Sequence, residues 1–231
     1  MKIVIVTIFM ALCLFLAYGN HNLEEQAKAI FKSWFVDFEP FQDGEFIDSE
    51  LGQIPAGWRI GTFGEIANVS SGKRPKKKSD SKSEECMIPL VGASCIMGFT
   101  SDYLYNTPII VTGRVGTHGV IQYFNEKCWP SDNTLVIQSK YLNFAYFFLK
   151  TIDFSSLNRG STQPLITQSD IKKQPCFIIP HNIISDFEEK LYPIRALIQN
   201  NLCENQKLSQ LRDTLLPKLM SGEIDVSEVE V

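Results

Sequence analysis

The densest group of chemically active side chains is a basic run at residues 72–78. Five of its seven residues are cationic: Lys73, Arg74, Lys76, Lys77 and Lys78. Gly72 and Pro75 favour a loop over a helix or strand. Cations in an exposed loop can contact nucleic-acid phosphates, which supplies affinity and register but little sequence information. Because Asp80, Glu84 and Glu85 follow closely, an ordinary solvated loop is the alternative.

Two further segments carry side chains of types that contact DNA. In the run 159–164 the candidate contacts are Arg159, Ser161, Thr162 and Gln163. Arginine and glutamine can form paired hydrogen bonds with the edges of guanine and adenine, respectively. In the glycine-rich run 112–119 the candidates are Arg114 and His118. This run lacks the Gly-Lys-Ser/Thr ending of a phosphate-binding P-loop, and a structural turn is an equal alternative.

No residue pattern in the sequence indicates catalysis or metal binding. Cys128, His118 and Asp132 could be arranged as a thiol nucleophile, a base and an orienting acid, but no local motif surrounds Cys128. The six cysteines are irregularly spaced and include no Cys-x-x-Cys pair, which is typical of reduced cysteines. We therefore predict a non-enzymatic chain with no catalytic residue, no metal site and no cofactor of its own.

The overall composition limits how the chain could bind nucleic acid. Its 231 residues are 44% hydrophobic and 21% charged, with a formal net charge of −4. These values are ordinary for a globular protein. Because the chain as a whole is slightly acidic, any DNA contact must come from a local basic surface.

Two helices with unpartnered apolar faces are expected at the ends of the chain. Residues 22–38 repeat apolar side chains at three- and four-residue steps, with Asn22 as a cap and Pro40 as a stop. Residues 182–218 show coiled-coil-like spacing over roughly 55 Å, with Pro193 expected to kink or restart the helix. Since neither face can be buried alone, we expect the two helices to pair with each other. The residues expected to pack between them are Phe31, Trp34, Phe38, Leu191, Ile198, Leu202, Leu211 and Leu215.

Between these helices the sequence predicts a mixed α/β (α+β) domain. Strands are expected at 87–91, 108–112, 118–124, 133–138 and 176–179. Helices are expected at 141–150 and 168–173, the second with a capping box formed by Thr167 and Asp170. Residues 39–57, which are rich in Gly and Pro, are interpreted as a linker with little regular structure.

Taken in order, several segments resemble the specificity subunit of type I restriction–modification enzymes. The matching segments are 29–41 (AIFKSWFVDFEPF), 54–67 (IPAGWRIGTFGEIA), 111–121 (VTGRVGTHGVI), 129–137 (WPSDNTLVI), 160–180 (GSTQPLITQSDIKKQPCFIIP) and 204–226 (ENQKLSQLRDTLLPKLMSGEIDV).

The resemblance implies a division of labour among polypeptides. The family's subunit carries two target-recognition domains, each reading half of a split double-stranded DNA site, spaced by two conserved antiparallel helices. Those helices dock modification subunits, which methylate adenine with S-adenosylmethionine, and a restriction subunit uses ATP and Mg. The implied boundaries in this chain are 21–39 (conserved helix), 40–57 (linker), 58–180 (recognition domain), 181–220 (C-terminal conserved helix) and 221–231 (acidic tail).

This chain departs from the family pattern because it has one recognition domain and a short first helix. Residues 1–20 form an apolar leader that we expect to lie outside the functional fold. A cytoplasmic protein is expected, and export or membrane anchoring through this leader is the alternative. The chain is interpreted as half of a specificity subunit, able to pair as a homodimer through its helices. An inert truncated remnant is the other reading.

Overall fold

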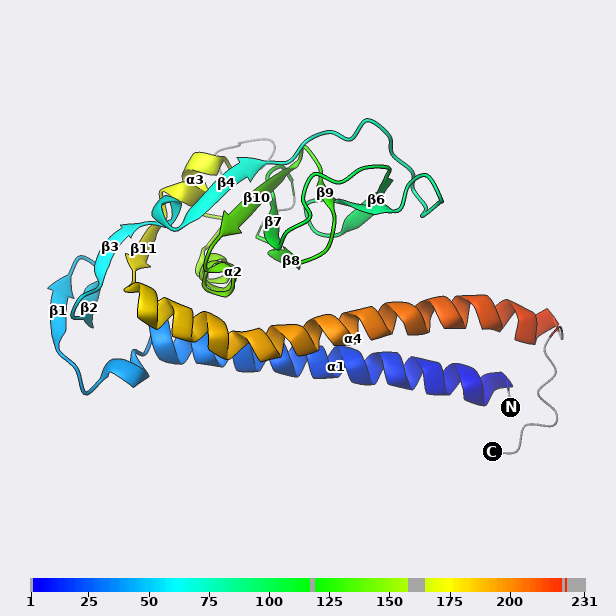
Figure 1. The fold of residues 1–231 in the computed structure, drawn as a ribbon, viewed down its shortest axis with the longest axis horizontal. Coiled ribbons are helices and arrows are strands. Elements are labelled where there is room, and N and C mark those ends of the chain that lie inside the picture. The colour runs from blue at the N-terminus through cyan, green and yellow to red at the C-terminus, as the bar shows by residue number, and fades with distance from the viewer. Residues whose placement is uncertain (1, 117–118, 158–164, 222, 224–231) are drawn as a thin grey trace. The chain divides into compact units, whose positions relative to one another are not determined.

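The computed structural model (Figure 1) describes residues 2–116, 119–157, 165–221 and 223, with side chains from Tyr18 onward except at 219 and 220. The chain divides into two compact units. The helical unit comprises residues 1–37 and 189–231, and the mixed unit comprises residues 38–188. Among the residues whose side chains the structure describes, which begin at Tyr18, no helix combines the length and apolar character that crossing a membrane requires.

The helical unit is an antiparallel pair of long helices, as the sequence predicted. Helix α1 spans Lys2–Phe35 and α4 spans His181–Ser221. In Figure 1 they run side by side in opposite directions. Lys190 lies over the Trp34 ring, Arg195 pairs with Glu24 at 2.7 Å, and the Asn201 amide donates to Asn20 at 2.8 Å. Residues later in α4 therefore contact residues earlier in α1, as an antiparallel pair requires.

The predicted packing residues of this pair divide into two groups. Phe31, Leu191 and Ile198 are buried, and Trp34 and Leu215 are half-buried. Leu202 and Leu211 were expected in the seam, but they are 45% and 46% exposed. Next to Leu202, the part-buried Asn201–Asn20 amide pair forms a polar contact between the two helices. Helix α4 also continues without interruption through Pro193, so the expected restart does not occur.

The boundaries of α1 differ from the predicted helix at both ends. Because α1 already begins at Lys2, Asn22 is an interior residue rather than a cap, and residue 21 is no helix boundary. The helix ends at Phe35, before Pro40 is reached. Phe38 was expected to pack between the two helices, but it adopts a left-handed backbone conformation with φ 54°. Its ring lies in the mixed unit, 5.6–6.2 Å from those of Phe46, Trp58 and Phe177.

The segment expected to be an unstructured linker contains regular structure. A short 3-10 helix at Glu39–Phe41 precedes strands β1 (Phe46–Ser49) and β2 (Gly52–Pro55), which pair as an antiparallel hairpin. Ile54 on β2 is only 1% exposed. Gly and Pro in this segment mark the turns of the hairpin rather than an absence of structure.

The mixed unit is built on small sheets that the sequence partly predicted. Strands β3 (Arg59–Thr62) and β11 (Pro175–Ile178) pair antiparallel. A four-stranded antiparallel sheet has the order β4-β10-β7-β8, formed by Ala67–Ser71, Thr134–Ser139, Ile109–Gly113 and Gln122–Phe124. A three-stranded sheet has the order β6-β5-β9, formed by Ile96–Thr100, Ile88–Val91 and Trp129–Pro130. All five predicted strands are present, whereas β3, β4, β6 and β9 were missed, as were β1 and β2 of the hairpin.

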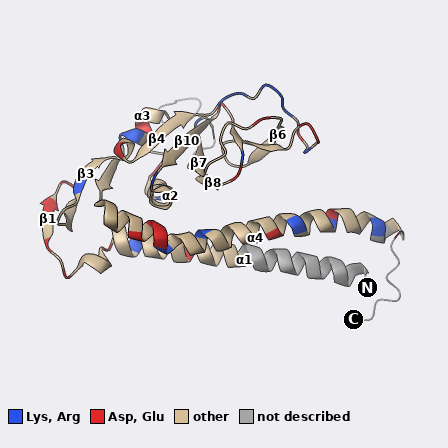
Figure 2. Ribbon diagram, in the orientation of Figure 1, with Lys and Arg blue, Asp and Glu red and all other residues tan. Residues whose placement is uncertain are grey.

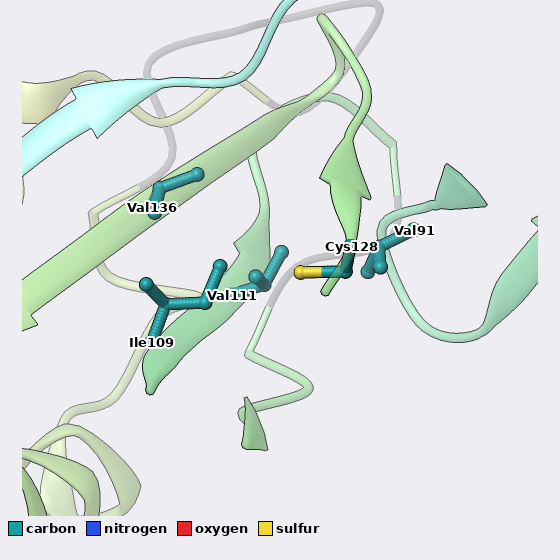
Figure 3. Close-up of a cluster of buried hydrophobic side chains, with 5 residues drawn as sticks. All are labelled: Val91, Ile109, Val111, Cys128 and Val136. Carbon is teal, nitrogen blue, oxygen red and sulfur yellow. The ribbon is translucent and has the colours of Figure 1, made fainter. Parts of the chain in front are cut away.

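The core between these sheets fixes which side chains face which way. Val91, Ile109, Val111, Cys128 and Val136 form a buried cluster (Figure 3). Because side chains alternate along a strand, Ile110 and Thr112 of β7 lie on the opposite face of the sheet from this cluster. There Ile110 pairs with Tyr123, whose ring contacts Tyr146 of α2 (Leu142–Thr151) at 5.9 Å. Helix α2 therefore covers this second face.

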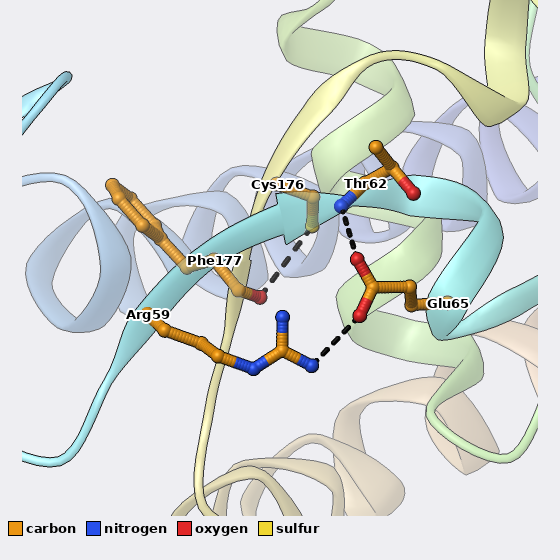
Figure 4. Close-up of polar contacts among 5 residues, drawn as sticks. All are labelled: Arg59, Thr62, Glu65, Cys176 and Phe177. Atoms are coloured by element: carbon orange, nitrogen blue, oxygen red, sulfur yellow. Dashed lines mark hydrogen bonds and ion pairs between the residues drawn. The ribbon is translucent and has the colours of Figure 1, made fainter.

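Short capped helices connect the sheets. Helix α3 (Gln168–Lys172) begins with the predicted capping box, in which Thr167 and Asp170 bond reciprocally. A second cap was not predicted and lies beside the β3–β11 pair (Figure 4), at the 3-10 helix Phe63–Glu65. Glu65 accepts hydrogen bonds from Arg59 at 2.7 Å and from the Thr62 backbone N–H at 2.8 Å, and these bonds lower its pKa. Cys176 of β11 is drawn in the same figure. Burial raises the pKa of its thiol to about 12.

Glu188, which lies near the start of α4, caps the N-terminus of α2. Its carboxylate accepts hydrogen bonds from the backbone N–H groups of Asn143 (3.1 Å) and Phe144 (2.8 Å), and from the Asn143 side chain (2.8 Å). These N–H groups have no partner within their own helix. A carboxylate at this position also interacts favourably with the helix dipole.

We expect Glu188→Ala to lower the free energy of unfolding by about 1–2 kcal/mol, as loss of a helix cap commonly does. Chemical denaturation of the full chain measures this. Glu189→Ala, at the exposed neighbouring position, is the matched control and should change little. Equal stability of the two variants would show that Glu188 does not cap α2.

Candidate nucleic-acid interface

The turn at residues 130–134, between β9 and β10, holds three separate parts of the mixed unit together. Ser131 N–H donates to the Val91 carbonyl at 2.9 Å. The Pro130 and Thr134 carbonyls accept from Lys73 and Gly72, at 3.0 and 3.1 Å. The Asn133 carbonyl accepts from Arg114 N–H at 2.9 Å. The turn therefore sets the positions of both the 72–78 run and the 112–119 run.

The basic loop, defined as Lys73–Lys78, is anchored at both ends. At its start, the Trp129 indole N–H donates to the Lys73 carbonyl at 2.6 Å. Just beyond its end, Ser79 and Phe99 of β6 exchange backbone hydrogen bonds at 2.9 and 2.8 Å. Figure 2 shows the cations of this loop along the connection that follows β4. The loop is exposed in its side chains but fixed in its course.

Gly72 is the residue that lets the basic loop approach the 130–134 turn. A Cβ atom here would lie 2.2 Å from the Ser131 carbonyl oxygen, 2.5 Å from that of Pro130 and 2.6 Å from Thr134 Oγ1. Two of these three atoms belong to the backbone, so they cannot rotate away. Only glycine permits this distance between the two segments.

The charges of the basic loop are partly neutralised by nearby acids. Arg74 pairs with Asp132 at 3.3 Å, Lys78 pairs with Asp80 at 3.8 Å, and Lys77 pairs with Glu85. The hydrogen bond between Lys77 and Glu85 raises the pKa of the lysine and lowers that of the glutamate. Within the described chain, no ion pair is formed by the two remaining cations, Lys73 and Lys76. Exposed pairs of this kind are weak, so the paired cations stay available to a polyanion.

Arg114 directly follows the last residue of β7, Gly113, next to the 130–134 turn. Its N–H bonds to Asn133, and its carbonyl accepts from Ile166 N–H at 3.0 Å. The next residue, Val115, bridges Leu165. The Arg114 side chain is half-buried, and its Nε is buried with no hydrogen-bond partner.

Two of the segments singled out in the sequence, 72–78 and the described part of 112–119, meet at one end of the four-stranded sheet. Strands β4 and β7 end there and the antiparallel β10 begins there, since Ser71 pairs with Leu135 and Gly113 with Thr134. We call this the sheet-end surface, comprising residues 72–78, 114–116, 130–134 and 165. Leu165 directly follows the run 159–164. The candidates His118, Arg159, Ser161, Thr162 and Gln163 lie outside the described residues.

The thiol chemistry considered for Cys128 does not fit the structure. Cys128 is fully buried in the core, and burial raises the pKa of its thiol to about 12. A thiol with that pKa forms almost no thiolate at neutral pH. Asp132, the supposed orienting acid, pairs with Arg74 instead. The described residues include no cluster of three or more His, Cys, Asp or Glu side chains placed to hold a metal ion.

The 130–134 turn was missed as the organising element of this site. The sequence does carry a signal, because Pro130, Ser131, Asp132 and Asn133 are turn-forming residues directly before a strand. Turn propensity alone gives no indication that Val91, Gly72 and Arg114 would bond to this turn. Those contacts depend on segments up to several tens of residues away.

Comparison with known proteins gives consistent matches to one family. The model of the type I restriction modification DNA specificity domain matches residues 55–184. The MjaIX specificity subunit of Methanocaldococcus jannaschii, a type I restriction enzyme, is 32% identical across 91% of this chain and 55% of its own length. The HindI specificity subunit of Haemophilus influenzae is 23% identical across 89% of this chain and 62% of its own length.

Solved structures share the fold. An S subunit of a type I restriction–modification system from M. genitalium has a TM-score of 0.64 and 18% identity, covering 92% of this chain and 58% of its own. The HsdS subunit from Thermoanaerobacter tengcongensis has a TM-score of 0.50 and 14% identity, covering 95% and 58%. This chain thus spans somewhat more than half the length of its relatives.

The family model covers more than half of the chain, including every strand from β3 to β11. The chain therefore belongs to the type I restriction modification DNA specificity family, as its sequence motifs had indicated. Proteins of this family that match it are named as specificity subunits, which are not themselves catalytic.

We expect Gly72→Ala to lower the free energy of unfolding by about 1–3 kcal/mol, because the new methyl group clashes with two fixed carbonyl oxygens. Chemical denaturation of the full chain is the measurement. Gly19→Ala is a control of opposite sign: Gly19 lies inside α1, and its added Cβ would have no contact closer than 4.0 Å. That change should raise stability by about 0.5–1 kcal/mol. A neutral Gly72→Ala would contradict the close approach.

Proposed function

We propose that this chain is a DNA sequence-recognition subunit of a type I restriction–modification complex, which binds half of a split site. The observation that carries the proposal is the sheet-end surface, where a fixed basic loop and Arg114 meet on one turn in a family of DNA specificity domains. The family's two-domain organisation assigns one half-site to one recognition domain. This chain has one such domain and spans about that share of its relatives.

In this proposal, the basic loop contacts phosphates. Its cations sit on a backbone fixed at both ends, so little loop ordering opposes binding. Because the whole chain carries a net charge of −4, the attraction to DNA is local to this surface. Phosphate contacts of this type position a protein on the duplex without selecting a sequence. Selection is left to Arg114 and to the candidates His118, Arg159, Ser161, Thr162 and Gln163.

We propose that the helical unit docks the modification and restriction subunits, or a second copy of this chain. Leu197, Leu202 and Leu211 on α4 are 45–51% exposed, which gives the helix apolar surface beyond its seam with α1. S-adenosylmethionine, ATP and Mg would act on those partner subunits. A homodimer would place two recognition domains in one assembly and would read a symmetric split site.

Mapping methylated adenines tests the proposal. The full chain is co-expressed with a type I modification subunit from the same organism, in cells lacking other adenine methylation, and genomic methylation is read with and without the chain. We expect a split motif that appears only with the chain, and a symmetric motif if two copies pair. Soluble chain without any motif would instead support the inert-remnant reading.

A further inference from the structure

Arg114 differs from every cation of the basic loop in the burial of its side chain. Its backbone is bonded on both sides, through its N–H to Asn133 and through its carbonyl to Ile166. Its side chain is half-buried, whereas Lys73, Arg74, Lys76, Lys77 and Lys78 are all exposed. The backbone that carries Arg114 is therefore fixed, and the half-buried side chain has less rotamer freedom to lose on binding than a fully exposed one.

The polar groups around Arg114 are incompletely satisfied. Thr112 lies two residues earlier on the extended β7 strand, so both side chains are on the face opposite the Val111 cluster. Thr112 Oγ1 and Arg114 Nε are both buried, and neither has a hydrogen-bond partner. Among the described residues, no acid forms an ion pair with Arg114. An unpaired, half-buried guanidinium is costly to the free protein, and a ligand that supplies acceptors removes that cost.

We propose that Arg114 reads a guanine base through its guanidinium fork, as a specificity-determining residue of the sheet-end surface. This assignment rests on the proposed DNA-recognition function. The planar guanidinium of an arginine suits the paired O6 and N7 acceptors that guanine presents in the major groove. The neighbouring basic loop already offers five exposed cations for phosphates, a contact that does not need a planar fork. Phosphate contact and base reading are thus divided between two segments tied to one turn.

The test selects binding sites from randomised duplex DNA with the purified full chain and two variants. Arg114→Lys keeps the positive charge but removes the fork, and Lys76→Ala removes an exposed, unpaired cation of the basic loop. Thermal unfolding confirms that each variant is folded. Affinity for the selected site and for its single-base variants is then measured at several salt concentrations.

We expect Arg114→Lys to lose preference at one G·C pair, with discrimination there falling on the order of 10-fold while other positions are kept. Lys76→Ala should keep the whole motif, weaken all sites similarly and reduce the salt slope by about one. An unchanged motif with Arg114→Lys, or equal weakening at every position, would overturn the assignment to guanine. Failure of the unaltered chain to select any motif would instead overturn the proposed function.

Discussion

The mixed unit depends on the close backbone approach between Gly72 and the 130–134 turn. That contact lets the turn bond at the same time to β5 through Val91, to the basic loop through Lys73 and to β7 through Arg114. Each hydrogen bond is ordinary in strength, and together they fix the positions of the three segments relative to the turn. A shift at this turn would move a core strand and both cationic segments together. The arrangement of charges at the sheet end is therefore a consequence of backbone packing rather than of attraction among the side chains.

This construction separates a rigid frame from adaptable contacts. The buried cluster around Val111 and the cap that Glu188 provides for α2 stabilise the frame. The lysines project from it into solvent, where salt screens them and nearby acids pair with some of them. Arg114 combines features of both, because its backbone is bonded into the frame while its buried Nε has no hydrogen-bond partner. A surface of this kind can hold DNA by charge and choose among sequences by geometry.

Features with a local cause were predictable from the sequence, and features set by distant contacts were not. Five strands, helices α2 and α3, the Thr167 capping box and the pairing of the two long helices follow from periodicity and capping residues, whereas the antiparallel direction of the pair was implied by the family resemblance. The β1–β2 hairpin and the position of Phe38 depend on an aromatic cluster with Trp58 and Phe177, which no local pattern reveals. The exposure of Leu202 and Leu211 likewise differs from what their spacing predicted. For the site, residue types indicated the cationic segments, whereas their convergence came from long-range bonds to the 130–134 turn.

Hydrogen–deuterium exchange of the full chain, with and without duplex DNA, tests the central claim most directly. If the sheet-end surface is the DNA-contacting surface, DNA should slow amide exchange at residues 72–78 and 114–116. The β1–β2 hairpin of the same unit serves as an internal reference and should exchange at the same rate in both samples. Protection of the hairpin, with residues 72–78 and 114–116 unaffected, would contradict the account.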